Sequence, residues 1–145
     1  MNRRTAVFAL IIFGLILQPA FQPLASVLQA LAAAAAPTQP ILISAAVCEN
    51  VKDLSPQNPA IVFSVAVGKV SCFSAFDPVS QNMPIYHNWY YRDKLITKIK
   101  LTLRTPRWST FSTIQLRESD IGPWRVEITD QEEKVFTVLR FSVTE

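Results

Sequence analysis

From Ile41 to the C-terminus, hydrophobic and polar side chains alternate with a period of two residues, as in β-strands that bury one face. The clearest example is the stretch 95–104. One of its faces carries Leu95, Thr97, Ile99, Leu101 and Leu103, and the other carries Ile96, Lys98, Lys100, Thr102 and Arg104. We expect the first face to be buried and the second to be largely solvated, as in an antiparallel sheet.

The same alternation predicts seven or eight strands with roughly ten-residue spacing. The predicted strands are 41–47, 61–67, 69–76, 85–91, 95–104, 108–116, 124–129 and 134–143. Proline-containing loops at 50–60 and 77–84, a bend at Gly68 and a short turn at 92–94 separate them. The sequence therefore predicts an all-β fold, either an antiparallel, Ig-like sandwich or a small open barrel, and we favour the sandwich.

The N-terminal segment 1–32 differs from the rest, because Arg3 and Arg4 precede the uninterrupted apolar run Ala6–Leu17. This run predicts a hydrophobic helix that is too short to cross a hydrocarbon core of about 30 Å, which favours a signal peptide cleaved near Ala32. The alternative is a retained anchor in the inner membrane, formed by residues 5–28. In both cases we expect an exported, periplasmic or extracytoplasmic protein, with a linker at 33–40 and one domain at 41–145.

The charge of the expected mature chain argues against one class of partner. The whole chain has 14 basic and 11 acidic residues, a net charge of +3. Arg3 and Arg4 belong to the N-terminal segment, so twelve basic residues remain beside the eleven acidic ones, a net charge of +1. Nucleic-acid binding usually needs a strongly positive face, and we therefore expect no nucleic-acid partner.

The remaining charge is arranged in two blocks of opposite sign. Residues 92–107 contain six basic residues and one acidic residue, and residues 118–133 contain six acidic residues and one basic residue. The blocks cancel if these segments pair as neighbouring strands. If they lie on opposite faces, they create a dipole suited to contacts with a protein or with an anionic membrane surface.

Cys48 and Cys72 both lie in the part that is expected to be exported. In an oxidising compartment two thiols most simply form a disulfide, which contributes roughly 3 kcal/mol in the chain-entropy description. Two buried free thiols are the alternative. No metal site is expected, because the chain has one histidine and no C-x-x-C spacing.

His87 is the only imidazole in the chain. No G-x-S-x-G elbow or glycine-rich phosphate loop accompanies it, and five of the eleven carboxylates lie in the segments 117–120 and 130–133, where solvated charge is their ordinary role. We therefore predict that the protein is not an enzyme and needs no cofactor.

The strand period places His87 on the same face as Ile85, Trp89 and Tyr91. We expect His87 to be hydrogen-bonded to a neighbouring strand or loop. Two alternatives remain open at this point: a place at the rim of an aromatic groove with Trp89, where it touches a ligand, and ligation of a metal ion.

The other two tryptophans have different surroundings in the sequence. Trp124 alternates with hydrophobic residues and is predicted to lie in the core. Trp108 follows Arg107 in a polar segment, where its indole ring suits either packing or stacking on a sugar, a peptide or another subunit.

Several pieces of the sequence carry a family resemblance. These are CENVKDLSPQNPAIVFSVAVGKVSCFSAF, IYHNWYY, RWSTFST, GPWRVEI and the closing FSV. In order and approximate spacing they resemble the bacterial domain of unknown function 2914 over 41–143. The pair His87 and Trp89 and the motif Gly122, Trp124 and Val126 are its most specific elements. The resemblance implies an extracytoplasmic or membrane-linked β-domain that serves as an accessory module, and it implies no known activity.

Together these observations predict a non-catalytic, exported binding module that docks onto a partner protein or a membrane complex. The predicted contact surface carries Lys98, Lys100 and Arg104, with Arg107 and Trp108 at its end. The alternative is recognition of a carbohydrate or cell-wall polymer through Trp108, Trp89 and Tyr91.

Overall fold

The computed structural model describes residues 39–145, and the structural statements below concern this part of the chain. The predicted signal peptide or anchor and most of the predicted linker lie outside the described residues. Within 39–145, no helix is long and apolar enough to cross a membrane.

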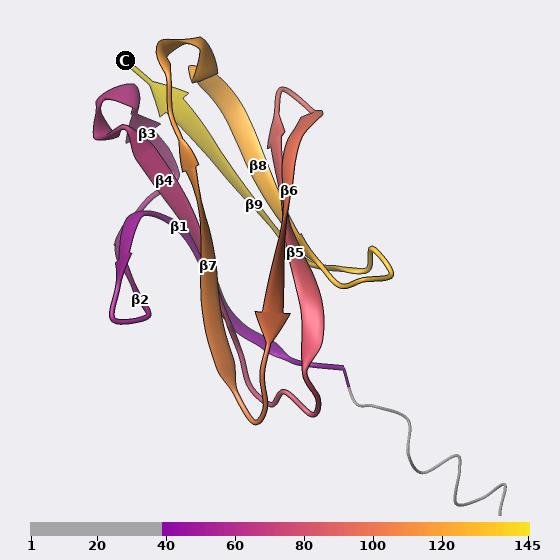
Figure 1. Ribbon diagram of the computed structural model, residues 1–145. Helices are drawn as coiled ribbons and strands as arrows, with labels where there is room; N and C mark the ends of the chain where they lie inside the picture. The colour runs from indigo at the N-terminus through magenta and orange to yellow at the C-terminus, as the bar shows by residue number, and fades with distance from the viewer. Residues whose placement is uncertain (1–38) are drawn as a thin grey trace, which may run out of the picture. The chain divides into compact units, whose positions relative to one another are not determined.

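Two β-sheets face each other as the layers of an open sandwich (Figure 1). The four-stranded sheet has the order β2 (Ser55–Pro59), β1 (Leu42–Lys52), β4 (Lys69–Phe76) and β7 (Trp108–Gln115). The five-stranded sheet has the order β3 (Val62–Ser64), β9 (Val135–Thr144), β8 (Gly122–Thr129), β5 (Met83–Tyr91) and β6 (Lys94–Leu103). All neighbours are antiparallel except β3 and β9. The predicted all-β sandwich is confirmed. Two short 3₁₀ turns, Val65–Val67 and Glu118–Asp120, complete the described elements.

The core lies between the inner faces of the two sheets. Its largest fully buried side chains include Trp89 and Ile85 of β5, Phe76 and Val70 of β4, and Leu103 of β6. Trp124 is 5% exposed, which confirms its predicted place in the core. Because every second residue of each strand enters this layer, the alternation in the sequence decides which side chains form it.

The predicted alternation of β6 holds from Thr97 to Leu103 but fails at Leu95. Thr97 lies opposite Trp89, whereas Leu95 lies opposite Tyr90, so the register skips Ile96 at a bulge. Such an extra residue reverses the facing of everything on one side of it. Leu95 consequently shares the outer face with Tyr90 and is 47% exposed, although the sequence predicts that it is buried.

The segment 50–60, predicted as a loop, instead extends β1 and forms the edge strand β2. Asp53 and Leu54 connect the two strands at φ values of 49° and 52°, the left-handed conformation that a two-residue hairpin turn requires. Pro56 and Pro59 lie in β2, and an edge strand tolerates proline because one of its sides needs no hydrogen-bond donors.

The predicted disulfide is absent, and Cys48 and Cys72 are buried free thiols. In the register of β1 and β4, Cys72 lies opposite Val47, and Cys48 lies opposite Ser71. Consecutive residues of a strand point to opposite faces, so the two thiols lie on different sides of the sheet. Burial raises the pKa of both thiols.

Candidate functional site

His87 lies at the centre of a hydrogen-bonded network that joins the two sheets. Its Nδ1 atom lies 2.8 Å from the Ser112 hydroxyl of β7, and its Nε2 atom lies 3.1 Å from the Ser74 hydroxyl of β4. The indole N–H of Trp89 donates to the same Ser112 hydroxyl over 3.1 Å. Both ring nitrogens of His87 therefore have partners inside the sandwich.

The imidazole of this network has no surface exposed to solvent. His87 and Trp89 are both 0% exposed, so they lie in the interior and not at the rim of a groove. Burial lowers the pKa of His87 to about 4, and the ring is neutral at pH 7. Among residues 39–145, no three His, Cys, Asp or Glu side chains are grouped so that they could hold a metal ion. The geometry of His87 is that of a structural residue.

Tyr91 is also engaged by packing, at the end of the core. Its hydroxyl donates to the Ile121 carbonyl over 2.8 Å, and its ring centroid lies 5.0 Å from that of Trp124. Little of the ring remains available for stacking on a ligand.

Lys98 and Lys100 lie on the outer face of the five-stranded sheet, as predicted for the wet face of their strand. The register places Lys98 opposite Asn88, and Lys100 opposite Tyr86. The Lys98 ammonium lies 4.6 Å from the centre of the Tyr86 ring. We call Tyr86, Asn88, Tyr90, Lys98 and Lys100 the tyrosine–lysine face.

The remaining predicted contact residues lie where β6 passes into β7. Arg104, Arg107 and Trp108 are exposed, and the Arg104 guanidinium lies 5.4 Å from the Trp108 ring centre. Trp108 lies opposite Phe76 in the four-stranded sheet. The eight predicted binding residues therefore divide among the core, the tyrosine–lysine face and this junction, and they do not form one site.

The two charge blocks are not neighbours in the sheet, because β5 separates β6 from β8. The two blocks contact each other only through individual ion pairs among the described residues. Lys98 lies 3.5 Å from Glu133, and Arg125 pairs with Asp93. Cancellation between the blocks is therefore local.

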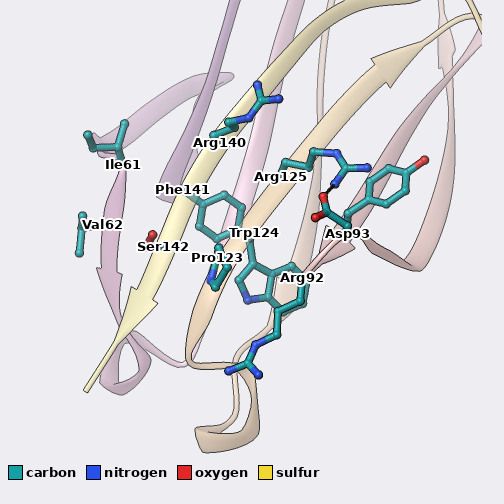
Figure 2. A pocket seen from close by; sticks show the side chains of 11 residues that line it. Ile61, Val62, Arg92, Asp93, Pro123, Trp124, Arg125, Arg140, Phe141 and Ser142 are labelled. Carbon is teal, nitrogen blue, oxygen red and sulfur yellow. Dashed lines mark hydrogen bonds and ion pairs between the residues drawn. The ribbon is translucent and has the colours of Figure 1, made fainter.

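A cavity of about 430 Å³ on the outer side of the same sheet was not predicted from the sequence. Figure 2 shows that its arginines come from three elements: Arg92 from the turn after β5, Arg125 from β8 and Arg140 from β9. Ile61, Val62 and Pro123 add an apolar wall. We call this cavity the arginine pocket. The strand register places Arg125 directly opposite Arg140, whereas the Arg92 guanidinium points away from both (Figure 2) and lies over the Tyr91 ring.

The comparisons with known proteins agree with the resemblance in the sequence over residues 82–143 of the stretch 41–143 that it covers. Residues 82–143 match the family model described as "Protein of unknown function (DUF2914)". The match spans β5 to β9 and contains His87, Trp89, Gly122, Trp124 and Val126, the residues of the two most specific motifs. No curated protein matches the chain. The chain therefore carries a DUF2914 domain at residues 82–143.

Proposed function

We propose that this domain is a non-catalytic binding module that docks onto an acidic surface of a partner protein through the tyrosine–lysine face. The single observation that carries the proposal is the state of Asn88. This residue is 6% exposed, its amide nitrogen donates to the Thr129 hydroxyl over 3.1 Å, and its Oδ1 atom has no partner. A buried acceptor without a donor costs free energy, and a docked protein that moves the covering side chains aside and supplies a donor recovers it.

The side chains around Asn88 suit such an interface. Tyr86 lies beneath the Lys98 ammonium, and Tyr90 lies 4.0 Å from the Arg125 guanidinium, so both rings are held in place by cations. Tyrosine and arginine are enriched at protein interfaces, because they present large and rigid contact surfaces with polar ends.

Charge favours an acidic partner. Lys98 contacts Glu133 at 3.5 Å, but the two side chains are 38% and 79% exposed, and exposed pairs of this kind are weak. Within 39–145, Lys100 makes no ion pair. Lys100 is therefore free to pair with a carboxylate of a partner, and Lys98 gives up only a weak, exposed pair to do so.

The module acts outside the cytoplasm in this proposal, close to the membrane, in line with the basic and apolar N-terminal segment. Recognition of a glycan is the weaker alternative. Of the three aromatic residues it needs, Trp89 is buried and Tyr91 is packed against Trp124, so Trp108 alone offers an exposed ring.

Capture of partners from solubilised envelope fractions, followed by mass spectrometry, tests the docking proposal. The double variant Lys98→Glu and Lys100→Glu should lose the acidic protein that the unaltered chain retains, with a larger effect at low salt than at high salt. The matched control is Lys52→Glu with Lys69→Glu on the four-stranded sheet, which changes the net charge equally. Equal capture by both double variants would reject the tyrosine–lysine face as the contact.

A further inference from the structure

Each sheet of the sandwich ends in two edge strands, β2 and β7 in one sheet and β3 and β6 in the other. An exposed edge carries unpaired backbone groups, and proteins protect it with prolines, lysines or a short strand. β2 contains Pro56 and Pro59, and β3 is three residues long. β6 carries Lys98 and Lys100. These three edges are therefore protected against pairing with another chain.

β7, at the end of the four-stranded sheet, has no such protection (Figure 1). Its eight residues, WSTFSTIQ, include no proline and no charged side chain, and most of them are β-branched or aromatic. Ser112 points inward to His87, so its neighbour Phe111 lies on the outer face of the sheet, where it is 42% exposed. Long, uncharged edge strands of this composition readily pair with another strand.

The hydrogen-bond pattern indicates which residues of β7 face the free edge. The Leu116 amide donates to the Gly68 carbonyl over 2.9 Å, at the position that continues the register of β4 and β7. Hydrogen-bonded positions alternate along an antiparallel pair, so the even-numbered residues of β7 bond to β4. The odd-numbered residues direct their N–H and C=O groups away from β4, where no backbone group within 39–145 bonds to them. These residues are Ser109, Phe111, Thr113 and Gln115.

We propose that β7 pairs antiparallel with β7 of a second copy of this chain. In such a pair, side chains on the same face lie opposite each other, so odd-numbered residues face odd-numbered residues. A two-fold axis at Phe111 meets this condition. It places Phe111 opposite Phe111 of the second copy, and Ser109 opposite Thr113 of the second copy. All these residues have free N–H and C=O groups, so the pairing completes both edges.

Side chains favour this register over its neighbours. Phe73 of β4 is 4% exposed and lies opposite Phe111, so the two copies join their phenylalanines into one row across the outer face. Aromatic pairs across antiparallel strands are stabilising. A shift by two residues in either direction separates the two Phe111 rings. One of these shifts also places Arg107 opposite Arg117 of the second copy, where like charges repel.

The chemistry of this edge is self-complementary, which favours a second copy as its occupant. β7 has no charged side chain, so two copies meet there without repulsion. Ser109 and Thr113 bring one hydroxyl each to their cross-strand pair, and a hydroxyl both donates and accepts. Two copies of the β6 edge would instead bring lysines together.

The proposed dimer leaves the tyrosine–lysine face free, because that face belongs to the five-stranded sheet. A two-fold axis that pairs identical faces of two antiparallel strands is perpendicular to the sheet. Both five-stranded sheets therefore lie on the same side of the joint sheet, and both tyrosine–lysine faces point in one direction. The dimer thus offers two docking faces to one surface, which increases avidity. The pairing of β7 itself does not rest on the docking proposal.

The test is sedimentation velocity of the full chain in a mild detergent over a wide range of protein concentration. We expect a reversible equilibrium between monomer and dimer. Phe111→Lys places like charges at the two-fold axis and should weaken dimerisation by roughly tenfold or more. Leu54→Lys, at an exposed position in the turn between β1 and β2, is the matched control and should dimerise like the unaltered chain. Equal dimerisation of the two variants would overturn the inference.

A mixture of the Phe111→Lys and Phe111→Glu variants tests the position of the axis. Each variant alone opposes like charges, whereas the mixed pair opposes a cation to an anion and should recover the dimer. Without recovery, the axis does not lie at Phe111 and the inference fails. Ser109→Pro serves if these variants do not fold, because the Ser109 amide points away from β4 and its loss breaks no bond of the sheet. This variant should also be monomeric, and undiminished dimerisation would count against β7.

Nitroxide labels on the Gln115→Cys variant measure the register by electron spin resonance. With the axis at Phe111, the two Gln115 backbones lie about 27 Å apart along the sheet, and a shift by two residues changes this distance by about 7 Å. Cys48 and Cys72 are buried, so the unaltered chain is the control for labelling. A distance outside this register would overturn the proposed pairing. A chain that stays monomeric while Phe111→Lys reduces capture of another protein would assign β7 to that protein and reject the second copy.

Discussion

His87 and Asn88 are neighbours on β5, both polar and both buried, yet they differ in how far their hydrogen-bonding atoms have partners. His87 points into the sandwich, where each ring nitrogen has a serine partner. Asn88 points outward, where its amide nitrogen has a partner and its oxygen has none. The comparison separates the two faces of one strand: the inner face is complete by itself, and the outer face lacks a donor.

The difference points to the outer face of β5, and not to the inner face, as the surface that binds a partner. A histidine in a strand rich in aromatic residues is a candidate ligand-binding residue in the sequence, but His87 instead forms hydrogen bonds that join the two sheets. The residues beside it, Tyr86, Asn88 and Tyr90, are chemically less conspicuous, and they carry the unmet hydrogen bond and the cation contacts. We therefore expect changes on the inner face to affect stability, and changes on the outer face to affect binding.

The largest effect is expected from Trp89→Ala on the inner face. The substitution opens a cavity and removes the indole donor to Ser112, and it should lower the free energy of unfolding by about 3–5 kcal/mol in urea titrations. Tyr86→Ala, on the outer face of the same strand, should lower it by about 1 kcal/mol. Equal losses would abolish the distinction between the faces. Trp89→Phe, which keeps a ring but lacks the indole donor, gives a milder variant if the alanine form does not fold.

Lowering the pH should destabilise the inner face of β5, because His87 lies on that face and titrates in the acidic range. The folded pKa of this residue is about 4, whereas its ordinary value is 6.5, so the unfolded chain binds a proton more readily between these values. The free energy of unfolding that depends on His87 therefore falls by about 3 kcal/mol as the pH is lowered from about 6.5 to about 4.

The measurement is urea unfolding at a series of pH values, with His87→Gln as the reference. Carboxylates titrate in both proteins, so the difference between the two pH profiles isolates the imidazole. Parallel profiles from pH 7 to pH 4 would mean that His87 is reached by solvent or by an acidic partner in the folded state.

Strand positions were predictable from the sequence because alternation is local. Thr97, Ile99, Leu101 and Leu103 face inward as expected, and Trp124 lies in the core as expected. The bulge at Ile96 was not predictable, because it depends on how β6 aligns with β5, and a single extra residue turned Leu95 outward. The missing disulfide has a similar origin, since the register of β1 against β4 places the two thiols on opposite faces.

The candidate sites were less predictable, because their residues meet only through pairing between strands and between sheets. Ser74 and Ser112 reach His87 from the opposite sheet, and no local pattern marks them as its partners. In the same way, Arg125 and Arg140 are ordinary outward-facing residues of their own strands. Their apposition is a property of the β8–β9 register.

The smallest effect on stability is expected at the unmet hydrogen bond itself. The double variant Asn88→Val and Thr129→Val removes the Asn88–Thr129 hydrogen bond together with the unpaired oxygen. Replacing both partners by apolar groups of similar shape is nearly neutral, so the free energy of unfolding in urea should change by less than about 1 kcal/mol. Capture of the docking partner should nevertheless fall, because the acceptor that the partner satisfies is gone. A stable variant with undiminished capture would show that the partner does not use the Asn88 oxygen, and the comparison between the two faces of β5 would lose its link to binding.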